Sequence, residues 1–148
     1  FGVGRMAKGT GIMLASASKG PGVLGPIIVR NKNSNNFIFA GVASGGISPP
    51  MSLMNIFGRT MIAGESLKHA ISAVRVYNSG VPDITFYEPL MGETSKDFLK
   101  NRGHYLKVTP IISVVNAVHC SEGLPRASET CAIISDPRGS GLATEVSQ

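Results

Sequence analysis

The sequence has few cysteines, no long apolar run and no cluster of positive charge, and each shortage excludes a class of protein. The two cysteines and three histidines show neither Cys-x-x-Cys nor His-x-x-x-His spacing, so we expect no metal site. The apolar runs are short, as at residues 26–29 and 111–115, whereas a membrane span needs roughly 18–20 residues. The lysines and arginines are spread along the chain. The net charge of +5 therefore indicates a solvated basic surface and not a nucleic-acid site.

What remains is the composition of an ordinary globular protein. With 43% hydrophobic and 16% charged residues the chain is not expected to be disordered. Its 148 residues correspond to one domain or to part of a larger one. Phe1 does not read as a natural start and no signal peptide opens the chain, so we expect residues 1–148 to derive from a longer precursor. No motif calls for a cofactor.

An apolar hairpin is the clearest local prediction. Residues 26–30 and 37–40 favour strands, and the polar, turn-prone residues 31–36 separate them. Both arms are apolar at successive positions and do not alternate, which predicts a sheet covered on both faces. Residues 12–14 predict a further short strand, followed by a loop over residues 15–25.

Helix signals follow the hairpin. Ser48 as N-cap before Pro49 predicts a buried helix to about residue 62, with its methionine-rich stripe in the core. A second helix is expected over residues 65–73. Thr94-x-x-Asp97 resembles a capping box, which predicts a short helix over residues 96–102 that ends at Gly103.

The remaining apolar segments predict strands at residues 84–87, 105–108, 111–119 and 131–135, the last two paired across a loop at residues 121–130. The whole is an α+β pattern with a mostly antiparallel sheet. Cys120 and Cys131 stand at the two ends of that loop. They are either two reduced thiols or a disulfide, and opposed positions on paired strands favour the disulfide, which would imply an oxidising compartment.

Several short segments together resemble the small subunit of the γ-glutamyltransferase (glutathione hydrolase) family. Each is weakly specific alone, but they follow one another in the family's order over nearly the whole chain. They are Phe1-Gly2 with Thr10-Gly11-Ile12 and Gly25-Pro26-Ile27-Ile28-Val29, Gly41-Val42-Ala43-Ser44-Gly45-Gly46, Ala73-Val74-Arg75, Tyr87-Glu88-Pro89, Asn101-Arg102-Gly103-His104, Ser113-Val114-Val115-Asn116-Ala117-Val118 and Ser135-Asp136-Pro137-Arg138-Gly139.

The resemblance implies an αββα sandwich of the N-terminal-nucleophile hydrolase type, completed by a larger subunit from the same precursor. It also implies a secreted or cell-surface protein in which the small subunit's N-terminal Thr attacks γ-glutamyl amides, its own α-amine serving as base. That Thr lies upstream of the family's Phe-Gly, so no catalytic residue is expected in this chain. Gly45 and Gly46 match the family's oxyanion loop, although an ordinary tight turn is the alternative.

The chain departs from the family where the glutamate head is bound. The family's acidic loop is replaced here by residues 15–20, which carry no carboxylate and include Lys19. Residues 22–26 likewise replace the serines that bind the substrate's α-carboxylate.

Three hypotheses follow: a homologue with degraded γ-glutamyl binding and a binding or structural role; an active hydrolase or transferase with its Thr on another segment; and an independent binding module. His69, His104 and His119 lie on separate predicted elements and are expected to be structural, as is a turn-stabilising pair of Asp136 and Arg138.

Overall fold

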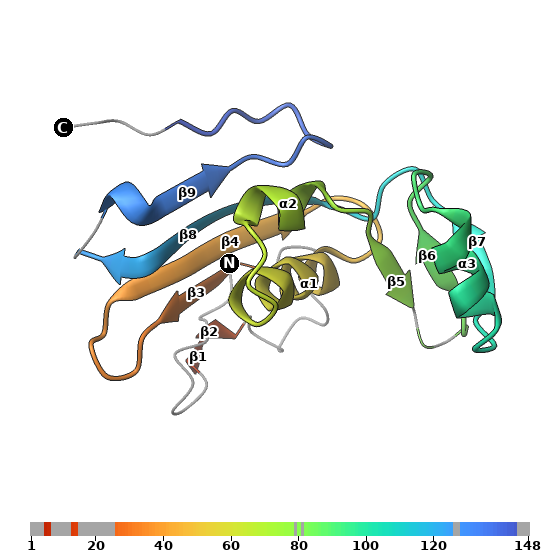
Figure 1. Cartoon of the computed structure of the whole chain (residues 1–148), viewed down its shortest axis with the longest axis horizontal. Coiled ribbons are helices and arrows are strands. Elements are labelled where there is room, and N and C mark those ends of the chain that lie inside the picture. The colour runs from red at the N-terminus through yellow and green to blue at the C-terminus, as the bar shows by residue number, and fades with distance from the viewer. Residues whose placement is uncertain are drawn as a thin grey trace.

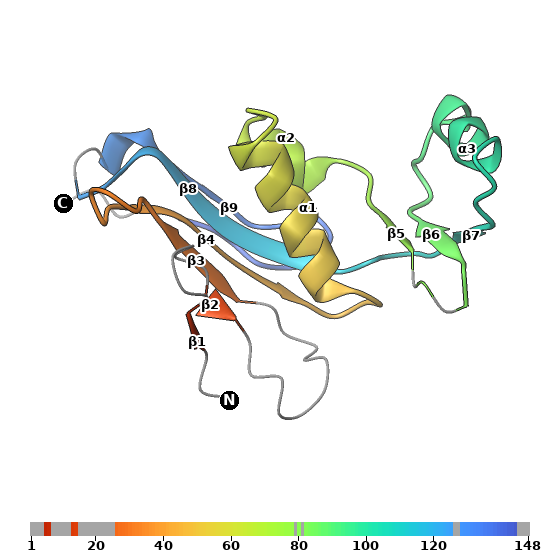
Figure 2. The ribbon, with the colours of Figure 1, turned by 90° about the horizontal axis from the view of Figure 1, so that it is seen from below.

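The computed structural model describes residues 5–6, 13–14, 26–78, 80, 82–125 and 128–144. These residues form a main sheet with two helices on one face and a smaller lobe beside it (Figure 1). The main sheet is antiparallel with strand order β3-β4-β8-β9, made of Ile27–Arg30, Phe37–Ser44, Val114–Leu124 and Cys131–Ile134. The short pair β1 (Arg5–Met6) and β2 (Met13–Leu14) lies on the face away from the helices (Figure 2). The α+β class is confirmed.

The predicted hairpin is β3 and β4, and its loop is built by one asparagine. The Asn31 side-chain oxygen accepts hydrogen bonds from the Asn33 and Ser34 amides at 2.9 and 3.0 Å. Such an Asx arrangement favours a turn, and Asn35 completes it with φ 58°. The second arm continues beyond the predicted residue 40 to Ser44, because it pairs with β8 over its whole length.

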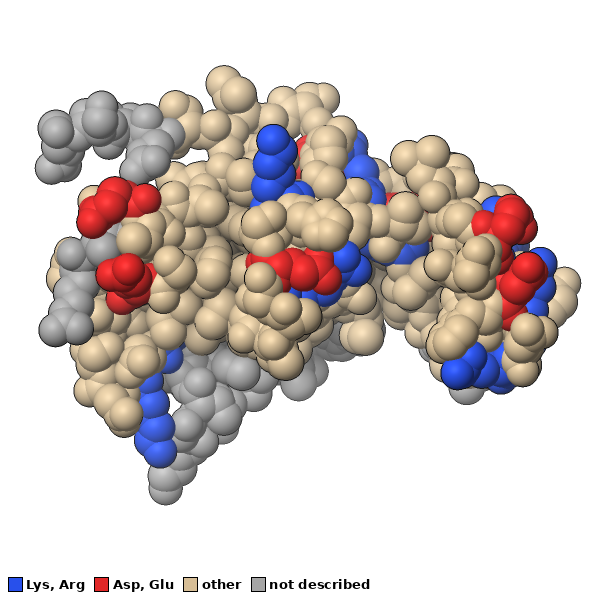
Figure 3. Space-filling view, viewed as in Figure 1, with Lys and Arg blue, Asp and Glu red and all other residues tan. Residues whose placement is uncertain are grey.

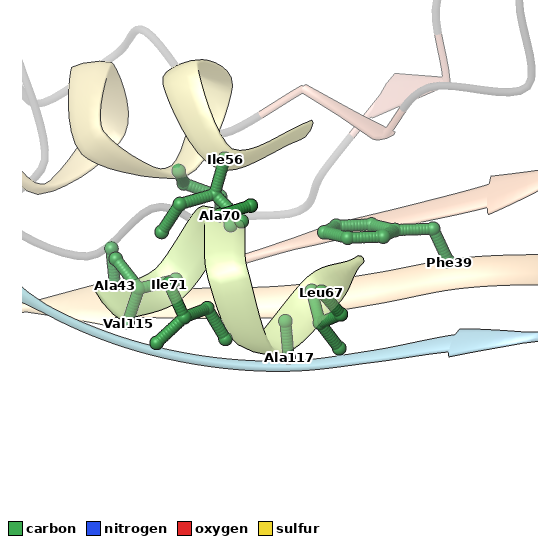
Figure 4. Close-up of a cluster of buried hydrophobic side chains, with 9 residues drawn as sticks. Phe39, Ala43, Ile56, Leu67, Ala70, Ile71, Val115 and Ala117 are labelled. Carbon is green, nitrogen blue, oxygen red and sulfur yellow. The ribbon is translucent and has the colours of Figure 1, made fainter. Parts of the chain in front are cut away.

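Helices α1 (Pro49–Met61) and α2 (Leu67–Ser72) cover one face of this sheet, and the core lies between the two layers (Figure 2). Figure 4 shows side chains from both helices meeting those of β4 and β8. Phe39 of β4 is fully buried and stacks edge-on against Phe57 of α1, with ring centroids 5.5 Å apart. Ser48 precedes α1 and Pro49 opens it, so the predicted start is confirmed.

One prediction about burial stays open and another needs correction. Within this chain the helices cover one face of the hairpin, and Ile28 and Val42 point away from them, each 40% exposed, so cover of the second face by another chain stays a prediction. The methionine stripe of α1 is only partly core: Met51 and Met54 lie on its outer side, 56% and 48% exposed, whereas Met61 packs against the core. The inward residues of α1 include Leu53 and Ile56. Because apolar residues lie on both the inner and the outer side of α1, the sequence pattern does not indicate which side packs against the sheet.

The smaller lobe holds β5 (Val76–Asn78), β6 (Thr85–Tyr87), β7 (Leu106–Val108) and α3 (Glu93–Lys100). β6 and β7 are parallel, the exception to the predicted antiparallel pairing. The capping-box prediction is wrong: Gly92 is the N-cap and Thr94 lies inside α3. Gly103, with φ 84°, does follow the helix end as expected. On the face in Figure 3 the positive charges are scattered and, in this lobe, mixed with acidic side chains.

β8 is longer than predicted and runs to Leu124, so it takes in the first part of the expected loop. Cys120 of β8 lies directly opposite Cys131 of β9 in the register. The two are disulfide-bonded with Cα atoms 3.9 Å apart, which confirms the predicted pair. In the part of the chain that the structure describes, no helix is long and apolar enough to cross a bilayer.

Candidate functional site

The predicted oxyanion glycines lie at the corner where β4 ends, β8 begins and α1 starts. Gly45 and Gly46 directly follow β4, and both have φ 65°, the left-handed region that glycine enters without steric cost. Both residues are exposed. Neither amide donates a hydrogen bond to another described residue, so both N–H groups are free to face a ligand.

Ile112 holds this loop from below. Its buried carbonyl oxygen accepts hydrogen bonds from the amides of Ile47 at 2.8 Å and Ser48 at 3.3 Å. Gly46 passes so close that a Cβ atom there would overlap the Ile112 carbonyl and lie 2.9 Å from the Ser113 nitrogen. Gly45 has open space at the same position. Of the two residues, Gly46 alone lacks room for a side chain, in addition to the left-handed φ that both share.

The start of α1 adds little to this donor set. Pro49 and Pro50 occupy its first two positions and carry no N–H, and the Ser52 amide already donates to the Ser48 carbonyl at 3.2 Å. A helix N-terminus normally offers several free amides to an anion. Here the two glycine amides are the main donors, an arrangement able to stabilise a developing oxyanion.

A buried charge network lies behind the loop. Arg75, 2% exposed, donates to the Asp136 carboxylate at 2.6 Å and to the carbonyl oxygens of Ile71 and Ser113. The same carboxylate oxygen accepts from the Val115 amide at 2.8 Å. Arg75 and Asp136 thus tie the end of α2 to the start of β8.

A second ion pair joins the first. Arg138 binds Glu88 through two guanidinium nitrogens, at 2.8 Å from Nε, and reaches Asp136 at 3.2 Å. It also donates to the carbonyl oxygens of Ile71 and Ala73 at 2.9 and 2.8 Å. Bidentate guanidinium–carboxylate pairs of this kind are rigid as well as strong.

Burial and pairing within the network shift the pKa values of Arg75, Asp136 and Arg138. Burial lowers the pKa of Arg75, against the opposing effect of Asp136. Burial would raise the pKa of Asp136, but the amides of Arg138 and Val115 and the Arg75 guanidinium hold that pKa below its ordinary value. Burial would lower the pKa of Arg138, yet Glu88 and Asp136 raise it. The shifts of Asp136 and Arg138 therefore follow from pairing, whereas that of Arg75 follows from burial.

Sequence reasoning found only part of this network. Asp136 and Arg138 were expected as a local turn pair, and they do bond to each other, but their main partners are Arg75 and Glu88. Those partners stand 61 and 50 residues away in the sequence. Nothing in the local pattern signals such contacts.

The other candidate residues either stand alone in the structure or lie outside the described part of the chain. His69, His104 and His119 remain apart, as expected; His104 contacts the Thr85 hydroxyl at 3.0 Å, and burial lowers the pKa of His119. Within the described ranges no three His, Cys, Asp or Glu side chains gather as metal ligands would. Phe1, Lys19 and the rest of residues 15–25 lie outside the description.

Comparison with known families identifies the chain. The family model described as Gamma-glutamyltranspeptidase matches residues 13–146. The chain belongs to this family. The resemblance read from the seven ordered segments is thereby confirmed.

Solved γ-glutamyltranspeptidase structures share the fold. That of Pseudomonas nitroreducens, complexed with L-DON, superposes with a TM-score of 0.71 at 22% identity over 90% of this chain and 68% of that chain. The T380A mutant of the Helicobacter pylori enzyme gives 0.67 at 23% identity over 85% and 67%. The Bacillus anthracis transpeptidase CapD gives 0.64 at 17% over 90% and 80%. No curated protein sequence matches the chain.

Proposed function

We propose that this chain is the C-terminal part of the small subunit of a γ-glutamyltranspeptidase-like protein that keeps the oxyanion loop but recognises γ-glutamyl groups poorly. The observation that carries the proposal is the paired geometry of Gly45 and Gly46. Two consecutive left-handed residues with free amides, fixed over the Ile112 carbonyl, form the donor set that an acyl-transfer site requires.

A larger partner subunit is part of the proposal. The sheet face away from the helices is largely apolar, and a groove of about 690 Å³ lies between it and residues 141–144, which line its other side. Ile28, Val42 and Ile133 line it, each about two-fifths exposed. β1, β2 and residues 141–144 lie against part of this face, and the apolar surface left exposed favours association or aggregation. We infer that a second sheet from the partner covers this face, which would complete the αββα sandwich and argues against an independent binding module.

The weak γ-glutamyl recognition rests on the sequence of residues 15–26. The family pairs the substrate's ammonium with carboxylates, whereas this chain supplies Lys19, a charge of the wrong sign. An unpaired buried charge typically costs several kcal/mol. A loss of about 4 kcal/mol corresponds to roughly a thousandfold in rate.

The competing hypothesis is an active glutathione hydrolase or transferase with its nucleophilic Thr on another segment. The Gly45-Gly46 geometry supports this hypothesis as well as the first, and the sequence of residues 15–26 is what separates the two. Both hypotheses share the heterodimer and the oxidising, extracellular or cell-surface location that the disulfide supports.

The test is a turnover assay of the native assembled protein with a chromogenic γ-glutamyl amide, beside an ordinary family member. We expect activity about a thousandfold lower or none. Turnover close to that of the family member, abolished by a Thr-directed inactivator, would establish the active hydrolase instead.

A further inference from the structure

Ile112 links the charge network to the glycine loop through its two backbone groups. Its carbonyl oxygen holds the Ile47 and Ser48 amides, as described above. Its own amide donates to Glu88 Oε1 at 3.3 Å. Ile112 is 1% exposed, so water does not replace either contact. The orientation of this one residue therefore sets the support under Gly46.

Glu88 is itself firmly held. Besides Ile112, its carboxylate accepts from the Arg75 amide at 3.0 Å and from two nitrogens of Arg138. Only 4% of the residue is exposed. Its donors come from three separate segments of the chain, so the carboxylate has a single position. Glu88 also follows β6 directly and joins the smaller lobe to the main sheet.

We propose that Glu88 is a positioning residue for the oxyanion donors, acting through Ile112 on the amides of Gly45 and Gly46. The proposal rests on the proposed function of those amides. The glycines have no side chains with which to anchor themselves, so the Ile112 carbonyl defines where their N–H groups point. Displacements of a fraction of an ångström at such donors change transition-state stabilisation strongly.

Glu88→Gln tests this with little change of shape. It keeps an acceptor for the Ile112 amide but removes the charge that holds Arg138. Glu65→Gln is the control: Glu65 forms a two-nitrogen ion pair with Arg59 between α1 and α2, at 2.7 and 3.0 Å, with no contact to Ile112. Any general effect of losing an ion pair appears in both variants.

The readout is the NMR resonance of the Gly46 amide in the native assembled protein, prepared with glycine that is isotope-labelled at its nitrogen and its carbonyl carbon. Gly45-Gly46 is the one Gly-Gly pair in residues 1–148, so within this chain the Gly46 amide alone couples to a labelled preceding carbonyl, and its loss in Gly45→Ala assigns it in the assembled protein. We expect Glu88→Gln to shift this resonance by more than its line width and Glu65→Gln to leave it in place. An unmoved Gly46 resonance in folded Glu88→Gln protein overturns the proposal.

Two further arms keep the test decisive. If Glu88→Gln does not fold, Arg138→Lys loosens the same carboxylate and should move Gly46 in the same direction by less; an unmoved resonance again overturns the proposal. If the native protein turns over a γ-glutamyl amide, Glu88→Gln should lower kcat about tenfold with KM unchanged. The resonance is read without turnover, so failure of the proposed function is seen separately.

Discussion

Replacing Gly46 with alanine, beside the same change at Gly45, separates backbone strain from lack of space. The two residues are adjacent, exposed and share φ 65°. They differ in one respect: a Cβ at Gly45 meets nothing within 4 Å, whereas a Cβ at Gly46 overlaps the carbonyl group of Ile112. Any difference between the two variants therefore reports the close approach of the loop to Ile112.

The expected magnitudes follow from these two terms. An alanine held in the left-handed region costs about 1–2 kcal/mol, so Gly45→Ala should lose that much free energy of unfolding. Gly46→Ala carries the same cost plus about 1–3 kcal/mol for overpacking against rigid backbone. The overlap involves backbone that β8 and Glu88 hold in place, so relaxation offers little relief.

The assay is urea or thermal unfolding of the native assembled protein, in which 1 kcal/mol moves Tm by roughly 2–4 °C. We expect Gly46→Ala to be less stable than Gly45→Ala by about 1–3 kcal/mol. Equal stability of the two variants would show that the Ile112 carbonyl does not support the loop, and the oxyanion geometry would lose its basis.

Four other outcomes are expected. Because pairing lowers the pKa of Asp136 in the folded state, its stabilising contribution is complete above the unfolded pKa near 3.8 and is lost as the pH falls through the lower folded value; Asp136→Asn should remove this acid dependence and cost about 3–5 kcal/mol in urea unfolding at neutral pH. Burial lowers the pKa of His119 below 6.5, so stability should fall as the pH drops through that value, and a flat Tm between pH 7 and 5 in His119→Gln, but not in the parent, checks it. Replacing Cys120 and Cys131 by alanine removes a disulfide that joins residues 11 positions apart. The free energy of unfolding should fall by about 3 kcal/mol or less in the same unfolding assay. Native mass measurement should find the chain with a larger partner, and a monodisperse species of this chain alone would contradict that.

The sequence predicted the elements of the fold well wherever local chemistry decides them. The hairpin around Asn31, the start of α1 at Pro49 and the pairing of Cys120 with Cys131 follow from the rules for turns, for proline at a helix start and for strand pairing. The inward face of α1 was harder to predict, because Met51 and Met54 fit an apolar helical stripe as well as Leu53 does. Only the packing against β4 and β8 decides between them.

The candidate site divides in the same way. Gly45 and Gly46 could be singled out because they match the family's oxyanion loop, whereas the local pattern alone predicts only a tight turn. The charge network could not, because Arg75 and Glu88 reach residues 61 and 50 positions away. Ile112 is less accessible still to sequence reasoning, because it contributes only backbone groups and those carry no residue-specific signal.

The most direct test of the account compares two substrates of the native assembled protein: a γ-glutamyl anilide and the same anilide without the α-amine and α-carboxylate. We predict weak turnover of both, with kcat/KM values within about tenfold of each other, because the proposed function keeps the Gly45-Gly46 donors and loses recognition of the glutamate head. A preference of about a thousandfold for the γ-glutamyl anilide would contradict it.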